Sequence, residues 1–424
     1  MKTVILNGQV IDPGNGINGI RNLYINKNKI AGIGSKPAGF TADREVNASG
    51  QYVLPGIIDL CVRLREPGEE HKATIKSETR AAASAGITRM VCPPDTFPIV
   101  DTPAMVHMII NRAHDLGYAR VHPLGALTVG LKGQRLTDMA MLMDAGCVGV
   151  SNAQEIVKNT LVMRRAMQYA STYDLPVFLT PRDAWLQGNG VVHEGAISTL
   201  LGLPAIPEAA ETVGVARDLA LIETSGARAH FDLVSCGRSV TMIAEARNRG
   251  LPVTASVAIH QLLFSENDIG AFDTQYKVMP PLRTRQDRTE LIQGVAKGHI
   301  AAICSDHQPH GADSKLAPFS EAATGIAGTD TLLTLTMRLV REKKLDMETA
   351  VSALTVHPAR ILGTNAGHLG PGAQADLCLY DPQKNWQLNE HTMRSKGRNS
   401  PFYGAKLKGK VTQTMLSGKW VYQE

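Results

Sequence analysis

The feature that most constrains the fold is an alternation of short apolar runs with helix-like stretches through the middle of the chain. The stretches between the runs carry apolar residues three and four positions apart, and several of them end at glycine. Eight such alternations predict an α/β protein with a (β/α)8 barrel, whose functional groups lie at the carboxyl ends of the strands. The eight runs, in order, are "PGIIDLCVRL", "ITRMVCPP", "VHPLGALT", "GCVGVSN", "LPVFLTPR", "RAHFDLVSC", "LPVTASVAI" and "HIAAICSDH".

The residue pattern at both ends of the chain differs from that of the middle. "KTVILNGQVID" near the start and "KGKVTQTMLSGKWVYQE" at the end are short β-like segments, and Asn-Gly and Asp-Pro-Gly clusters mark turns near the start. We therefore expect residues 1–53 and 364–424 to form one small β domain together, with the barrel spanning residues 54–363.

Composition excludes several classes of protein. The 424 residues carry a net charge of +5, with no run of like charges of the kind that follows a nucleic-acid groove. No window approaches the roughly 18 apolar residues that a membrane helix needs, and the first residues lack the pattern of a signal peptide. We expect a cytoplasmic protein without nucleic-acid or membrane partners. The six scattered cysteines contain no CxxC pair, which favours buried thiols over disulfides or structural zinc.

The first barrel strand, in "LPGIIDLCVRLREPGEE", ends in an unexpected pair of residues. Alternation after Asp59 directs Cys61 and Arg63 inward, at the place where a barrel enzyme holds metal ligands. A guanidinium is always charged and cannot bind a cation, and placing it beside zinc costs several kcal/mol, or roughly a hundredfold in affinity. We expect Arg63 to form an internal ion pair with Asp306 or Glu66.

The last strand ends in "SDHQPH", where Asp306, His307 and His310 lie together. An aspartate and two histidines there could act as a base or as metal ligands. The less specific interpretation is an aspartate that orders its loop, with solvated histidines beside it. His230 and His260, on two other strands, are expected to be hydrogen-bonded histidines of the core or rim.

Several longer motifs resemble the dihydroorotases of the amidohydrolase superfamily. The resemblance covers nearly the whole chain and implies a barrel with a β-sandwich built from both termini. It rests on "LPGIIDLCVRLREPG", "VCPPDTFP", "GVVHEG", "KVMPPLRTRQDR", "AAICSDHQPH", "PFSEAATGIAGTDT", "SALTVHPARILG" and "KGRNSPFYG".

The resemblance also identifies where this chain departs from the family's metal site. Of the family's metal ligands only Asp306 is retained, and in the family that residue also handles the proton of the hydrolytic water. The other ligand positions carry residues unlike the family's histidines and aspartate: Cys61, Arg63, Asn152 with Ala153, Thr180 and Leu233. The resemblance therefore implies that no metal cofactor is bound.

The substrate positions implied by the resemblance are altered in parallel. Arg65 and His310 are kept and would hold the substrate carboxylate, and His260 also belongs to this remnant pocket. Asparagines of the family have become Asp95, which we expect to repel an anionic substrate, and Met279, which removes a hydrogen bond.

This pattern resembles non-catalytic dihydroorotase homologues that are structural partners of aspartate carbamoyltransferase in pyrimidine biosynthesis. It implies a homodimer within a larger hetero-oligomer containing the catalytic chain of that transferase. One alternative is an active dihydroorotase, which opens dihydroorotate to N-carbamoyl-aspartate, with a rebuilt zinc site made of Cys61, His230, His260 and Asp306. A third hypothesis is a sensor that binds a small carboxylate through Arg65 and His310.

Overall fold

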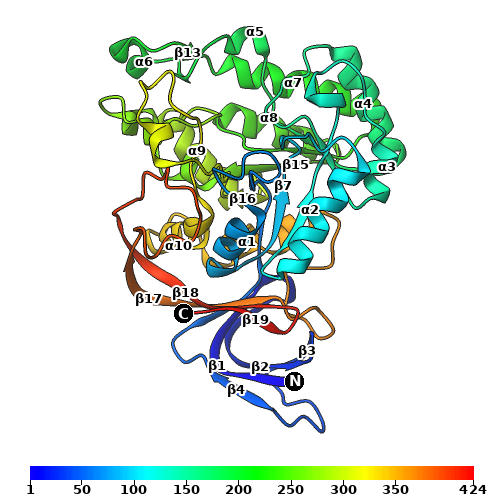
Figure 1. Cartoon of the computed structure of the whole chain (residues 1–424), viewed down its shortest axis with the longest axis vertical. Coiled ribbons are helices and arrows are strands. Elements are labelled where there is room, and N and C mark those ends of the chain that lie inside the picture. The colour runs from blue at the N-terminus through cyan, green and yellow to red at the C-terminus, as the bar shows by residue number, and fades with distance from the viewer.

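The computed structural model describes residues 1–424 and contains a parallel barrel beside a large sheet (Figure 1). This confirms the predicted barrel, with one strand split into two short segments. The barrel strands are β6 (Ile57–Asp59), β7 (Ile87–Cys92), β8 (Arg120–Pro123) continued by β9 (Gly125–Ala126), β10 (Val150–Ser151), β11 (Val177–Leu179), β14 (Ala229–Phe231), β15 (Val253–Ala258) and β16 (Ala302–Cys304).

The barrel closes at two seams. At one seam, Leu124 alone separates β8 from β9, so a single stretch of chain joins the two sheet segments. At the other, the backbone N–H of Arg63 donates to the His307 carbonyl at 2.9 Å, and that of His307 donates to the Cys61 carbonyl at 3.1 Å. The second seam therefore fixes the segments that carry Arg63 and Asp306 side by side.

Helices cover the outside of the barrel, and capping residues mark where the first two of them begin or end. The Thr74 hydroxyl accepts from the backbone of Ser77 at 3.0 Å and caps the first helix, and Gly117 ends the second in the left-handed conformation. The helices are α1 (Ile75–Ser84), α2 (Pro103–Leu116), α3 (Met139–Asp144), α4 (Thr160–Thr172), α7 (Ala209–Ser225), α8 (Gly237–Asn248), α9 (Arg285–Ala296), α10 (Leu332–Arg341), α11 (Met347–Ser352) and α12 (Val356–Ile361).

An excursion leaves the barrel between β11 and α7 and projects at the top of Figure 1. Arg283 holds it from below, because its Nη1 lies 3.1 Å from Nδ1 of His193 and 3.3 Å from the Ile206 carbonyl. The excursion contains α5 (Ala184–Gln187), β12 (Val192–His193), α6 (Ala196–Leu201) and β13 (Ala205–Ile206).

Strands from both ends of the chain form one eight-stranded sheet, next to which Figure 1 places both termini. Its order is β19-β18-β17-β5-β1-β2-β3, with β4 paired to β1. The domain boundaries at residues 53 and 364 remain predictions. The strands are β1 (Lys2–Asp12), β2 (Ile17–Asn26), β3 (Lys29–Ile33), β4 (Arg44–Asn47), β5 (Tyr52–Pro55), β17 (Leu377–Gln387), β18 (Lys406–Leu416) and β19 (Lys419–Gln423).

The remaining expectations about the whole chain concern membranes and cysteines. None of the helices combines the length and the apolar character required to span a bilayer. All six cysteines are free and buried, which confirms the prediction of core thiols.

Candidate functional site

Arg63 occupies the centre of the site expected at the carboxyl ends of the strands. Only 6% of its side chain is exposed; its Nε lies 2.8 Å from Oδ2 of Asp95, and its Nη1 lies 3.5 Å from Oδ1 of Asp306. The predicted pair with Asp306 is confirmed. The alternative partner, Glu66, was wrong, because its carboxylate instead accepts from the backbone of Ile75 at 2.7 Å and lies 3.5 Å from Arg112.

For both Arg63 and Asp306, burial shifts the pKa in one direction and the neighbouring charges shift it in the other. Burial raises the pKa of Asp306 to about 7, against the lowering effect of Arg63. Burial also opposes the charge on Arg63, but the nearby carboxylates outweigh it and raise the guanidinium pKa above its ordinary value. Arg63 is therefore a permanent buried cation, and Asp95 and Asp306 surround it as potential anions.

Cys61 lies beside the same carboxylate, with its Sγ 3.7 Å from Oδ1 of Asp306. Burial, followed by the carboxylates of Asp232 and Asp306, raises the pKa of this thiol well above its ordinary value. Since metals bind the thiolate rather than the thiol, Cys61 is poorly prepared as a ligand.

Two further buried acids belong to this layer. Asp59 accepts from the backbone of Ser305 at 3.0 Å, and Asp232 accepts from the Ser256 hydroxyl at 2.6 Å. Burial raises the pKa of each to about 6. Sequence reasoning gave Asp232 no role, although strict alternation in "AHFDL" directs it to the same side as His230 and could have identified it.

The four residues of the proposed rebuilt zinc site are not assembled as ligands. His230 bonds Thr254 through Nδ1 at 2.8 Å, as expected of a core histidine, whereas both ring nitrogens of His260 are buried without a partner. Burial lowers the pKa of both histidines to about 3, so both are neutral. No group of three or more His, Cys, Asp or Glu side chains in the chain is arranged to hold a metal ion.

The other altered ligand positions have structural roles. The Asn152 side chain accepts from the Thr128 hydroxyl at 2.7 Å and donates to the Leu131 carbonyl at 3.1 Å, ordering its loop. Leu233 is 2% exposed and packs with the apolar residues inside the barrel. Ala153 is buried, and Thr180, half-buried, directly follows β11. A divalent metal does not fit this set of side chains around a guanidinium.

A second arginine reinforces the positive charge at this end of the barrel. Arg182 is 6% exposed and donates through Nη2 to the Gln154 carbonyl, and the Gln154 amide donates to the Met279 carbonyl at 3.2 Å. Burial, together with the nearby charge of Arg63, lowers the Arg182 pKa to about 10. Met279 therefore contributes its backbone to a chain of hydrogen bonds.

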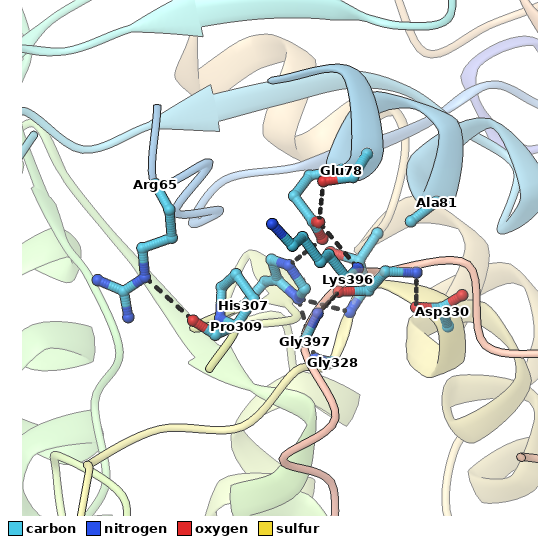
Figure 2. Close-up of polar contacts among 12 residues, drawn as sticks. Arg65, Glu78, Ala81, His307, Pro309, Gly328, Asp330, Lys396 and Gly397 are labelled. Atoms are coloured by element: carbon cyan, nitrogen blue, oxygen red, sulfur yellow. Dashed lines mark hydrogen bonds and ion pairs between the residues drawn. The ribbon is translucent and has the colours of Figure 1, made fainter. Parts of the chain in front are cut away.

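The retained substrate residues are already bonded to their surroundings. Arg65 points toward Pro309 (Figure 2), with its Nε 3.2 Å from that carbonyl and its Nη1 3.1 Å from Oε2 of Glu69. Its Nη2 lies 3.1 Å from Nε2 of His310. The expectation that Asp95 repels an anionic substrate stays a prediction; in the structure its negative charge is offset by the ion pair with Arg63.

His307 and Glu78 form a buried pair that Figure 2 shows at its centre. Nε2 of His307 lies 2.7 Å from Oε2 of Glu78, and Nδ1 accepts from the backbone N–H of Gly328 at 3.1 Å. Glu78 also accepts from the backbone of Lys396 at 3.1 Å, which ties the C-terminal segment to the barrel. The expectation of solvated histidines was wrong, since His307 is fully buried and His310 is 7% exposed.

Comparison with known proteins adds the family to this geometry. A model of the "Dihydro-orotase-like" family matches residues 50–239, and one of the "Amidohydrolase family" matches residues 297–422. A "Dihydroorotase-like protein" of Pseudomonas aeruginosa is 44% identical over 100% of both chains. This chain belongs to the dihydroorotase-like family of amidohydrolases. A "Dihydroorotase" of Anaeromyxobacter sp. strain K is 41% identical to this dihydroorotase-like chain, over 98% of it and 97% of the relative.

Solved structures agree on the architecture. An L-hydantoinase (dihydropyrimidinase) from Arthrobacter aurescens superimposes with a TM-score of 0.90 at 21% identity, covering 99% of this chain and 96% of its own. A dihydropyrimidinase from Brevibacillus agri gives 0.83, also at 21%, and covers 100% of this chain and 95% of its own. At this identity the likeness establishes the fold of the dihydroorotase-like chain, a barrel with a β-sandwich, and nothing about its chemistry.

Proposed function

We propose that this dihydroorotase-like chain does not hydrolyse dihydroorotate and instead acts as a structural partner of the aspartate carbamoyltransferase catalytic chain in pyrimidine biosynthesis. One observation carries the proposal: the buried guanidinium of Arg63 lies between Asp95 and Asp306. A charge that a metal would supply in this family is here supplied by the protein itself.

The physical argument starts from the hydrolytic water. Amidohydrolase chemistry at neutral pH needs a metal to lower the pKa of that water, and several His or carboxylate ligands must converge to hold the metal. Here one converging group is a cation, another is a protonated thiol and a third is Leu233. The surrounding fold is complete, so the chain keeps a surface on which a partner can assemble.

The assembly experiment uses the full chain and the transferase catalytic chain of the same organism. We expect co-purification as a complex larger than either component, which light scattering would measure, and a gain in the rate or stability of carbamoyl aspartate formation. The purified chain alone should not open dihydroorotate. Unchanged size and unchanged transferase activity on mixing would refute the proposal.

An active dihydroorotase is the second candidate, and two observations favour it. Relatives named "Dihydroorotase" are 41% identical over nearly the whole chain, and Cys61 lies 3.7 Å from Asp306. Metal analysis of protein purified without chelators separates the candidates. One zinc per chain that disappears in Cys61→Ala together with ring opening would establish the enzyme; metal-free, inactive protein would dismiss it.

The sensor hypothesis has less support, because the carboxylate-binding residues are bonded to each other. Binding of carbamoyl aspartate would have to displace Glu69 or His310 from Arg65. Calorimetry with millimolar carbamoyl aspartate tests this directly, and heat that vanishes in Arg65→Gln would support a sensor.

A further inference from the structure

A cavity of about 430 Å³ opens at the opposite end of the barrel from Arg63. Its rim includes residues that directly precede four strands: Pro176 before β11, Arg228 before β14, Pro252 before β15 and Ala301 before β16. Its volume falls in the range of roughly 300 to 1,000 Å³ that small-molecule sites have in proteins.

The lining of this cavity has a strongly one-sided charge. Arg228, Arg247 and Arg360 all contribute, together with His230 and His357, and no aspartate or glutamate is among the lining residues. Three guanidiniums around one cavity repel one another unless an anion lies between them. The lining therefore favours an anionic ligand.

Hydrogen bonds to neighbouring backbone carbonyls use only some of the donors of these arginines. Arg247 donates to the Gly298 carbonyl at 2.9 Å, and Arg228 donates through Nη2 to the Asp174 carbonyl at 2.9 Å. The Nε of Arg228 makes no hydrogen bond, although it lies 3.6 Å from Oδ1 of the exposed Asp174 in a solvent-screened ion pair. Arg360 lines the cavity from an exposed position, where its guanidinium can reach a ligand. Donors therefore remain available for a ligand.

The buried side chain of His230 also lines the cavity. His230 is 1% exposed, its Nδ1 is bonded to Thr254, and its Nε2 lies 3.9 Å from Oδ1 of Asp232, on the side of the carboxyl-end layer. His230 therefore adds a neutral ring to the lining, and the charge of the cavity comes from the three arginines.

Apolar residues complete the site. Leu251, Val253 and Ile361 line the cavity together with Pro176 and Pro252. They provide a surface for a ring or hydrocarbon portion, whereas the arginines suit an oxyanion with several terminal oxygens, which guanidiniums bind through paired hydrogen bonds. A carboxylate would carry one charge against three.

We propose that this cavity binds a small organic phosphate, with the phosphoryl group held by Arg228, Arg247 and Arg360 and the apolar body packed against Leu251 and Ile361. The site is distinct from the carboxyl-end site, and it stands whether or not the chain partners a transferase.

Calorimetry of the full chain tests the proposal with phenyl phosphate, inorganic phosphate and phenol as probes. We expect phenyl phosphate to bind at one site per chain, inorganic phosphate to bind about tenfold more weakly, and phenol to give no signal. Arg360→Gln and Arg228→Gln should each weaken phenyl phosphate binding about tenfold. Arg249→Gln, which changes an exposed arginine next to α8 outside the lining, should leave it unchanged.

Three results would overturn the proposal. The first is no heat from millimolar phenyl phosphate with folded wild-type protein, and the second is equal weakening by Arg249→Gln, which would indicate general surface charge. The third is equal affinity for inorganic and phenyl phosphate, which would show that the apolar residues do not contribute to binding and that the ligand is not an organic phosphate. Melting temperatures of the variants verify that they are folded, and two separate arginine variants prevent one misfolded protein from deciding the outcome.

Discussion

The two ends of the barrel differ in whether carboxylates lie among the arginines of the site. At the carboxyl end, Arg63 is paired with Asp95 and Asp306, and Arg65 is bonded to Glu69, Pro309 and His310. At the amino end, three arginines surround an open cavity without a carboxylate in its lining. In barrels of this class the chemistry belongs at the carboxyl end. The difference teaches that the side chains at each end, more than the fold, decide where a ligand can enter.

Removing the Arg63 charge should disturb the carboxyl end more than any other single change. Arg63→Met leaves Asp306 buried without its cation, and we expect a loss of about 3 to 5 kcal/mol in the free energy of unfolding, measured with urea. Arg112→Met, which breaks an ion pair of a half-exposed arginine, should cost less than about 1 kcal/mol. Equal losses in the two variants would show that the buried ion pairs of Arg63 contribute no more to stability than the ion pair of Arg112 does.

The Glu78–His307 pair provides the next largest effect. Glu78→Gln places an amide where two donors, His307 and the Lys396 backbone, need acceptors, and we expect a loss of about 2 to 3 kcal/mol at pH 7. Ser77→Ala is the comparison variant: it removes a hydrogen bond to Glu78 and the one that Ser77 accepts from the backbone of Thr74, and it should cost about 1 to 2 kcal/mol.

This pair also predicts a pH dependence. Burial alone would raise the pKa of Glu78, but the hydrogen bond from His307 outweighs it, and the folded pKa lies below the ordinary 4.5. The folded state therefore holds fewer protons, so this stabilisation is present above pH 4.5 and is lost as the pH falls through the lower folded value. The difference in unfolding free energy between wild type and Glu78→Gln should shrink in that acidic range; a constant difference would contradict the assignment.

A buried lysine near the carboxyl end should make stability depend on pH in a higher range. Lys315 donates to the Thr274 carbonyl at 2.9 Å and the Ala323 carbonyl at 2.7 Å, and burial with nearby Lys277 lowers its pKa to about 7. Above pH 7 the unfolded state binds the extra proton, so stability should rise with pH. We expect wild type to gain about 2 kcal/mol over Lys315→Met between pH 7 and 9, by urea unfolding. A gap that does not widen would refute the shift.

The smallest effect is expected at the amino end. Arg360→Gln removes one of three neighbouring cations, so without ligand the variant should be unchanged or more stable by less than about 0.5 kcal/mol at low salt. Because salt screens exposed charges, any gain should disappear in molar sodium chloride. A clear loss of stability would indicate that Arg360 has a structural partner and would weaken the contrast between the two ends.

The fold could be predicted because its signal is local. Apolar runs such as "LPVTASVAI" alternate with helical stretches, and each element can be recognised from its own residues. The pair of Arg63 with Asp306 could also be predicted, because a cation directed into a barrel needs a nearby acid. Its second partner, Asp95, could not, since that residue follows β7 and only the closed barrel brings it to 2.8 Å.

The amino-end cavity was missed for a related reason. Arg228, Arg247 and Arg360 lie on three different segments, each with an ordinary surface composition. From the sequence, each arginine alone is typical of a cation in a loop or at a helix end. Only the packing of the barrel places the three around one cavity. His230 was identified as a core histidine, and its bond to Thr254 agrees with that, but its place in the lining of the cavity could not be predicted.

The strand order of the large sheet has a consequence for synthesis in the cell. β5 is flanked by β1, which the ribosome releases before it, and by β17, which emerges only after the whole barrel segment has been made. Until then the backbone of Val53 and Leu54 lacks its antiparallel neighbours on β17 and presents an open edge to other nascent chains. Shortened products that stop before Leu377 should accumulate as aggregates, and this chain should depend on chaperones until β17 has been synthesised.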